Sequence, residues 1–103
     1  MRQMRKGVRL VKTLLMLESD LERAAMQYAE KRGWFEFKIE KASKGGLPDR
    51  FLSRFDRGVI LVEFKRDGEE PSAQQLKRHK ELRDHGVTVK VFDNLTAFKV
   101  YFR

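Results

Sequence analysis

The chain has 103 residues, of which 41% are hydrophobic and 11% aromatic. This size allows one small domain with a core near the lower limit for independent stability. The chain contains no cysteine, which excludes disulfides and thiolate metal sites and is compatible with a cytoplasmic protein. No apolar run approaches the ~20 residues that a membrane-spanning helix needs.

The formal net charge of +8 favours a polyanionic partner, because clustered lysine and arginine side chains bind phosphates and release counterions. The charge is uneven: five of the 23 lysine and arginine residues, and none of the 15 acidic residues, lie in residues 1–15. We therefore predict a basic N-terminal arm over residues 1–15 and a single domain over residues 16–103. Because Met4 and Met16 are alternative starts, the arm is either an extension or an artefact of the assigned start.

The first predicted element of the domain is a helix over residues 18–32, with Gly33 ending it. Alternation of apolar and polar residues predicts a strand over residues 34–39, and a loop rich in lysine and glycine follows it. For the helix over residues 18–32, apolar residues at helical spacing predict the face that packs on the core: Leu17, Leu21, Ala24 and Tyr28.

Two further strands form a predicted hairpin, over residues 49–55 and 59–66, joined by a turn at residues 56–58. A second helix is predicted over residues 72–85, ended by Gly86, and its apolar stripe consists of Leu76, His79 and Leu82.

The last predicted elements are a strand over residues 87–92 and a short tail. The tail "LTAFKVYFR" fits a turn of helix or a strand, and its alternation favours a strand in "FKVYF". The order is α-β-β-β-α-β with a possible final strand, which predicts an α/β fold whose central mixed sheet is flanked by helices. Strands 59–66 and 87–92 are then parallel, joined by a right-handed crossover.

The third strand changes character along its length. Val59, Leu61, Glu63 and Lys65 share one face, so an apolar face becomes charged where the strand leaves the core. Counting across the hairpin, about seven residues from Asp49 to the turn and about five from Gly58 to Glu63, places the two carboxylates at the same end of the ladder. Two adjacent carboxylates repel unless a cation lies between them, and Mg²⁺ or Mn²⁺ accepts two carboxylates, a backbone carbonyl such as that of Phe64, and water.

Lys65 follows Glu63 on the same face, where its ammonium group can orient or deprotonate a metal-bound water and offset negative charge on a phosphate. This set of groups is typical of a metal-dependent phosphodiesterase.

These residues resemble a known family. Pro48-Asp49 and Glu63-Phe64-Lys65 on consecutive strands match the PD-(D/E)xK nuclease superfamily, and the chain is more closely similar to its VRR-NUC (virus-type replication-repair nuclease) branch. Over residues 18–92 the matching motifs read, in order, Glu18, Arg32-Gly33-Trp34, Gly46-Leu47-Pro48-Asp49, Glu63-Phe64-Lys65, Ser72-Ala73-Gln74-Gln75 and Gly86-Val87.

The resemblance implies a restriction-endonuclease-like core and a homodimeric nuclease of bacterial or phage-infected cells. Such an enzyme acts on branched DNA such as the Holliday junction in replication, repair or recombination. It also implies that Glu18 joins Asp49 and Glu63 as a metal ligand and that Gln75 is catalytic. On a helical wheel Glu18 lies closer than Glu22 to the apolar stripe, and Gln75 lies on the stripe of its own helix.

Each candidate has a structural alternative. Glu18 also suits the first turn of a helix, Gln75 also completes a capping box with Ser72, and Glu63 with Lys65 also fits an exposed cross-strand charge pair. His79 is predicted to be a packing residue. The predicted nucleic-acid-binding residues surround the loop before Asp49 or follow the third strand: Lys38, Lys41, Lys44, Gly45, Gly46, Arg66 and Lys77.

The predicted function is a Mg²⁺- or Mn²⁺-dependent DNA endonuclease that acts as a homodimer without a small-molecule cofactor or membrane partner. The apolar side chains Phe98, Val100 and Phe102 in the tail are the expected reason for dimerisation. The alternatives are a non-catalytic basic DNA-binding module on the same fold and a small partner-binding protein without affinity for nucleic acid.

Overall fold

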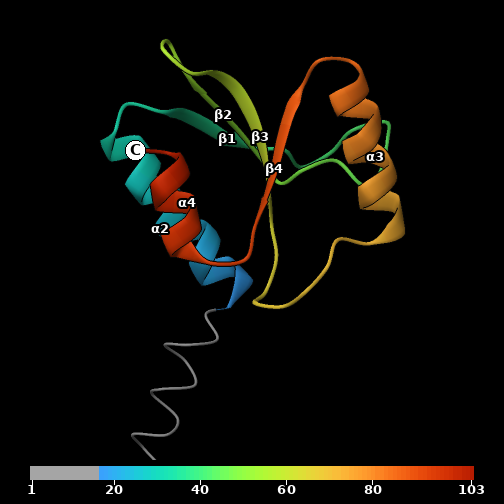
Figure 1. Ribbon diagram of the computed structural model, residues 1–103, viewed down its shortest axis with the longest axis horizontal. Helices are drawn as coiled ribbons and strands as arrows, with labels where there is room; N and C mark the ends of the chain where they lie inside the picture. Colours follow the sequence, from blue (N-terminus) through green and yellow to red (C-terminus); the bar gives the residue numbers. More distant parts are fainter. Residues whose placement is uncertain (1–16) are drawn as a thin grey trace, which may run out of the picture.

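The computed structural model describes residues 17–103, so the predicted basic arm lies outside the described residues. Figure 1 shows the arrangement of the elements, and no helix among them is long and apolar enough to cross a membrane. In chain order they are α2 (Glu18–Lys31), β1 (Phe35–Lys38), β2 (Arg50–Arg54), β3 (Gly58–Phe64), α3 (Ala73–Asp84), β4 (Thr88–Phe92) and α4 (Leu95–Tyr101).

The four strands form one mixed sheet in the order β1-β2-β3-β4. β1, β2 and β3 are successively antiparallel, and β4 lies parallel to β3 after the crossover through α3. The hairpin closes where Arg54 pairs with Gly58, whose φ of +73° requires glycine. The predicted α/β class and mixed sheet are therefore confirmed.

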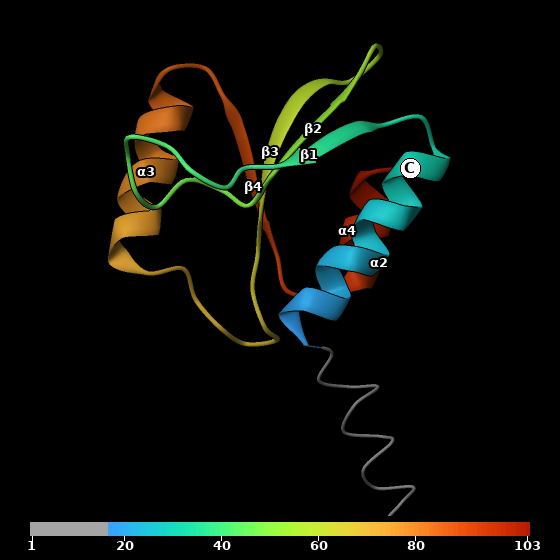
Figure 2. The same cartoon turned by 180° about the vertical axis from the view of Figure 1, so that it is seen from behind.

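α2 and α4 pack together on one face of the sheet, and α3 covers part of the other face. Figure 2 shows the two helical layers on opposite sides of the sheet. The α2–α4 side contains the hydrophobic core, to which β3 contributes every second residue from Ile60 to Phe64, while β2 and β4 contribute Leu52 and Phe92. Its buried side chains include Leu21, Ala25, Met26, Ala29, Trp34, Leu52, Ile60, Val62, Phe64, Phe92, Phe98 and Phe102.

The inward face of α2 differs from the predicted stripe. Leu21 is buried as expected, but Ala25 and Ala29 lie beneath the helix in place of Ala24 and Tyr28, and Leu17 is exposed. The small side chains of Ala25 and Ala29 let α2 approach β3 and α4 closely. The predicted stripe of apolar residues did not indicate this close approach.

The predicted final strand is wrong, because residues 95–101 form α4. The Asn94 side chain accepts a hydrogen bond from the Ala97 backbone N–H and so caps the helix at its N-terminus. Phe98 and Phe102 are four residues apart, which is one helical turn, and both are fully buried with their rings stacked at 4.3 Å. The tail therefore completes the core of its own chain and gives no reason for dimerisation.

The sheet face opposite α2 is only partly covered. α3 packs on β4 and buries one of its own residues, His79. Beside α3, the side chains of Phe35, Phe37 and Val59 remain 45–66% exposed. Phe37 stacks on Phe51 with ring centroids 4.6 Å apart. We call this uncovered part, consisting of Phe35, Phe37, Phe51, Val59 and Leu61, the apolar sheet face.

Candidate active site

The two strand carboxylates meet at one end of the β2–β3 hairpin. Arg50 pairs with Val62, so Asp49 lies opposite Glu63, one step beyond the ladder. The Phe64 backbone N–H donates a hydrogen bond of 2.8 Å to Asp49 Oδ2. This bond replaces the next rung of the ladder with a side-chain contact and fixes Asp49 at the end of β3. The predicted juxtaposition of Asp49 and Glu63 is therefore present.

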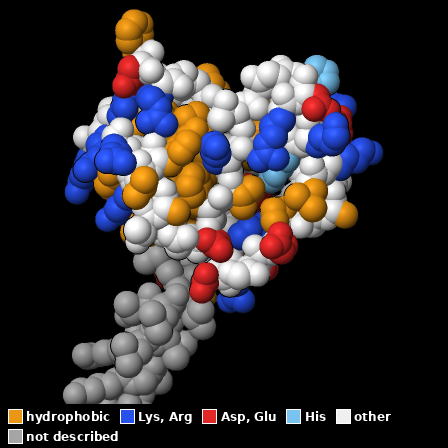
Figure 3. All heavy atoms as spheres, in the orientation of Figure 1, with side chains coloured by type: hydrophobic (Ala, Val, Ile, Leu, Met, Phe, Trp, Pro, Cys, Tyr) orange, Lys and Arg blue, Asp and Glu red, His pale blue; other side chains and the backbone are white. Residues whose placement is uncertain are grey.

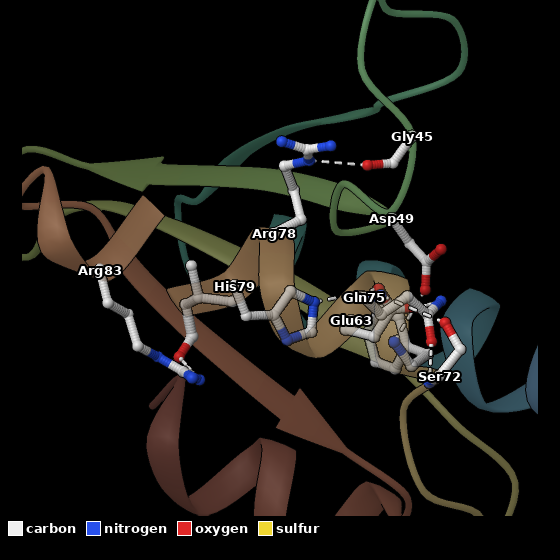
Figure 4. Close-up of polar contacts among 10 residues, drawn as sticks. Gly45, Asp49, Glu63, Ser72, Gln75, Arg78, His79 and Arg83 are labelled. Carbon is white, nitrogen blue, oxygen red and sulfur yellow. Dashed lines mark hydrogen bonds and ion pairs between the residues drawn. The ribbon is translucent and has the colours of Figure 1, made fainter. Parts of the chain in front are cut away.

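Glu63 is buried, with 1% of its surface exposed, and α3 faces both of its carboxylate oxygens. Gln75 Nε2 donates to Oε2 at 3.2 Å, and His79 Nε2 lies 3.4 Å from Oε1. Figure 4 shows these side chains reaching Glu63 from successive turns of α3. Gln75 and His79 are four residues apart and hence on one helical face.

The orientation of the Gln75 amide is fixed by the start of α3. Gln75 Oε1 accepts a hydrogen bond from the Ser72 backbone N–H at 2.8 Å, and the Gln75 backbone N–H donates to Ser72 Oγ. This is the capping box that the sequence allowed. Because the amide oxygen is occupied, the amide nitrogen is turned to Glu63, so the capping and site roles of Gln75 coexist.

Ionisation of the carboxyl groups is unfavourable at this site. Burial, and then the charge of Asp49, raise the pKa of Glu63 to about 8. Burial and the charge of Asp49 also raise the pKa of Glu18. Burial and the neighbouring Arg83 lower the pKa of His79, which favours the neutral ring. A carboxylate at Glu63 therefore requires a compensating cation at neutral pH.

α2 brings Glu18 toward the carboxylates and ties Glu22 elsewhere. Glu22 accepts a hydrogen bond of 2.5 Å from Arg50 Nε, and Arg50 Nη1 donates to Glu36 at 3.0 Å. Glu22 is thus held in an ion pair on the α2 side of the sheet, which leaves Glu18 as the helix carboxylate near Asp49 and Lys65. The preference for Glu18 over Glu22 is consistent with this arrangement.

The described residues do not include a complete set of metal ligands: no group of three or more histidine, aspartate or glutamate side chains among residues 17–103 is assembled to hold an ion. The residues nevertheless suit a divalent cation. Glu63 Oε1 is buried and has no hydrogen-bond partner among the described residues, and Asp49 is adjacent. Mg²⁺ binds through one or two carboxylates with water in its remaining positions.

Lys65 follows β3 directly and is partly buried, with its backbone N–H bonded to the Phe92 carbonyl. Its positive charge acts on Glu18, Glu63 and His79, so it lies at the site as predicted. Arg66 and Lys77 are exposed, the first in the loop after β3 and the second on α3.

The loop between β1 and β2 forms a hollow of about 520 Å³ that ends at Asp49. Lys41 and Lys44 belong to its wall, and Lys38 is exposed at the end of β1. Figure 2 shows this loop passing α3, where Arg78 Nε donates to the Gly45 carbonyl at 2.8 Å. The wall of the hollow therefore contains two lysines, Lys41 and Lys44, and one glutamate, Glu40.

Gly45 and Gly46 serve a contact that the sequence did not indicate. A Cβ at position 45 would lie 2.6 Å from Gln74 Nε2, and one at position 46 would lie 2.7 Å from the Gln74 carbonyl oxygen. Gly46 also has a φ of +77°. The two glycines therefore allow the loop to pack on α3.

His79 is the site residue that sequence reasoning assigned to packing alone. It is fully buried as predicted, yet its ring contacts Glu63. Its spacing of four residues from Gln75 was the available signal, because residues with this spacing share a helical face. Hydropathy alone could not distinguish a buried imidazole in the core from one against a carboxylate.

Comparison with known proteins gives two matches that bear on this site. The chain is 31% identical over 80 residues to "Putative nuclease p44" of Acyrthosiphon pisum secondary endosymbiont phage 1, covering 78% of this chain and 86% of the relative. A solved "VRR_NUC domain" superposes with a TM-score of 0.73 at 25% identity, covering 81% of this chain and 90% of that one. No protein-family model matches the chain.

Proposed function

The chain belongs to the VRR-NUC family of nucleases, and from that premise we propose that it is a Mg²⁺- or Mn²⁺-dependent DNA endonuclease. The observation that carries the proposal is the buried Glu63. Its pKa is raised to about 8 beside Asp49, so the folded chain holds two carboxylates where only a bound cation makes both of them stable at neutral pH.

Asp49, Glu63 and Glu18 are the proposed metal ligands, with the Phe64 backbone carbonyl as a further oxygen donor. A bound divalent ion would polarise the phosphate and activate a water molecule for hydrolysis. Lys65 is the proposed catalytic cation: it orients that water and offsets the charge that develops on the phosphate. Gln75 and His79 position Glu63 rather than contact the substrate.

The proposed substrate is branched DNA, such as a four-way junction formed in replication, repair or recombination in a bacterial or phage-infected cell. Lys41 and Lys44 support this proposal because they line the hollow that leads to Asp49, and Lys38 lies exposed at the end of β1, just before that loop. Arg66 and Lys77, with the backbone at Gly45 and Gly46, are the remaining proposed contacts to the DNA.

We propose that the active form is a homodimer built through the apolar sheet face. Exposed aromatic side chains that stack on one another are unusual on a monomer and typical of an interface. The pleat places Phe51 and Leu61 only two residues from Asp49 and Glu63 on the same sheet face. A twofold axis near Phe37 would therefore bring two active sites together, as paired cuts require.

The catalytic proposal is tested by incubating the purified protein with supercoiled plasmid and with a four-way junction. Nicking that requires Mg²⁺ or Mn²⁺, stops with EDTA and is absent from Glu63→Ala supports it. Metal-independent cutting, or full cutting by the variant, contradicts it. DNA binding without any cutting would instead identify a non-catalytic DNA-binding module, and the absence of salt-dependent binding would exclude a nucleic-acid partner.

The dimer is tested by light scattering at micromolar concentration. We expect a mass near twice 12.2 kDa and a monomer for Phe37→Glu. Phe55→Glu is the matched control, because Phe55 lies fully exposed in the β2–β3 turn, outside the apolar sheet face. A monomeric parent protein, or equal loss in both variants, would remove the proposed interface.

A further inference from the structure

Lysine and arginine side chains gather around three aromatic rings on the α2–α4 side of the sheet, opposite the side on which α3 contacts Glu63. Arg54 and Arg57 lie at the turn end of the β2–β3 hairpin, and Lys90 lies in register with Val62. Figure 3 shows this gathering of blue side chains on the side formed by α2, α4 and the β2–β3 turn. We call it the basic–aromatic surface. Its rings are those of Tyr28, Trp34 and Tyr101, and its cations are Arg32, Arg54, Arg57, Lys90 and Lys99.

The cation–π contacts form two adjoining groups, which are linked because Arg54 Nη1 donates a hydrogen bond of 3.0 Å to the Arg32 carbonyl. Arg32 and Lys99 lie over Tyr28, at 3.8 and 5.4 Å from the ring centroid. Arg57 lies between the Trp34 and Tyr101 rings, at 5.5 and 5.0 Å. Cation–π pairs of significant strength occur roughly once per 70–80 residues, so six in this small domain hold cations close together that would otherwise repel one another.

Most of these cations lack a neutralising partner. Within residues 17–103, Arg54 pairs with Asp56, whereas no carboxylate lies within ion-pair distance of Arg32, Arg57, Lys90 or Lys99. Residues 1–16 contain no aspartate or glutamate, so they cannot supply one. The four side chains are exposed and keep their charge available to an external anion.

The surface also accounts for the positive charge of the described part of the chain. Residues 17–103 contain 18 lysines and arginines and 15 aspartates and glutamates. The surface takes five of those cations and one carboxylate, that of Asp56, which leaves 13 cations against 14 carboxylates elsewhere. The rest of the described chain, which includes Glu18, Asp49 and Glu63, therefore has no net positive charge, and only local lysines such as Lys41 and Lys44 supply positive charge near Asp49.

We propose that the basic–aromatic surface is a second DNA-binding site, which holds the phosphate backbone of a duplex arm away from the point of cleavage. The proposal rests on the proposed nuclease function. Gly58 and Glu63 are five positions apart along β3, or roughly 17 Å. This corresponds to about five base pairs at ~3.4 Å each, so only a longer arm reaches the surface.

The test compares two branched DNA substrates that differ only in one arm, 4 or 16 base pairs beyond the cut, with binding measured in EDTA to prevent cleavage. We expect the parent protein to bind the long-armed DNA at least ~10-fold more tightly, because each phosphate contact contributes a salt-dependent gain. Arg57→Gln/Lys90→Gln should lose most of that difference and show a shallower salt dependence.

Two further variants keep the result interpretable. Arg23→Gln/Lys80→Gln removes the same charge from side chains that pair with Asp20 and Asp84, and it should bind like the parent protein. Arg57→Lys/Lys90→Arg keeps the charge and should retain the preference for the long arm. Equal loss in the Arg23/Lys80 control, or no arm-length effect in the parent protein, overturns the proposal. If the parent protein also fails to cut any DNA, the proposed function fails separately.

Discussion

The two faces of the sheet bury different kinds of side chain. Beneath α2 and α4 the contacts are aromatic and aliphatic, with Phe64, Phe98 and Phe102 fully buried. Beneath α3 the buried groups of the site are a carboxylate, Glu63, and an imidazole, His79. The first face supplies the hydrophobic free energy of folding. The second face holds a carboxylate whose ionised form destabilises the folded state. The protein tolerates this cost because hydrophobic burial on the first face stabilises the fold.

The largest expected effect is a loss of cleavage rate without a loss of stability, caused by a substitution on the α3 face of the sheet. Asp49→Asn removes one of the two carboxylates that a metal would require, so we expect the cleavage rate to fall by about 10³-fold or more. Binding to DNA should stay within a few-fold and the thermal unfolding midpoint should not fall. Cleavage at the parental rate would contradict the assignment of Asp49.

A substitution on the α2–α4 face should have the opposite character, because it lowers the stability of the fold. Phe98→Ala leaves a cavity among Phe64, Phe92 and Phe102, so we expect the free energy of unfolding to fall by about 3–5 kcal/mol. Val100→Ala on the exposed side of α4 should cost less than ~0.5 kcal/mol. Denaturant titration measures both, and a similar small cost in each would show that α4 is not a core element.

A third prediction uses the raised pKa of Glu63. From its ordinary value of 4.5 to about 8, the folded metal-free protein retains a proton that the unfolded chain has lost. Its stability is therefore highest at low pH and falls as pH rises through this range, by an amount on the order of 3 kcal/mol.

Chemical denaturation in EDTA at pH 5 and pH 8 measures this loss. Glu63→Gln should show a much smaller dependence on pH because it has no proton to release. Mg²⁺ at pH 8 should restore stability to the parent protein but not to Glu63→Gln. A parent protein that is as stable in EDTA at pH 8 as at pH 5 would refute the assignment.

The smallest predicted effect concerns Lys65. Lys65→Arg keeps the charge but replaces a compact ammonium with a planar group that cannot readily deprotonate or occupy the same point. We expect the cleavage rate to fall by at least ~10-fold, equivalent to about 1.4 kcal/mol, with little change in metal affinity. An unchanged rate would limit Lys65 to neutralising phosphate charge.

The sequence predicted best those features that depend on local periodicity. Alternation along residues 59–66 identified a strand with two unlike faces, and the hairpin count placed Asp49 and Glu63 at the same end of the ladder. The capping box at Ser72 and Gln75 was likewise readable from the sequence. A serine and a glutamine three residues apart at a helix start each accept a hydrogen bond from the backbone N–H of the other.

The features that it missed depend on packing between distant segments. Phe98 and Phe102 fit both alternation and a helical turn, and only the core beside Trp34 and Phe92 selects the helix. The contact of His79 with Glu63 and the ion pair of Arg50 with Glu22 join elements that are far apart in sequence. No local pattern encodes such pairs, so they required the folded chain.

The capping box has a consequence for the timing of catalysis. The hydrogen bond that begins α3 also turns the Gln75 amide toward Glu63, so fraying of the first helical turn removes one of the two α3 contacts to this proposed catalytic carboxylate, the other being that of His79. The first turn of a helix opens more readily than its centre. In the proposed nuclease, the fraction of molecules in which that turn is closed would therefore limit the fraction that is ready to cut at any instant.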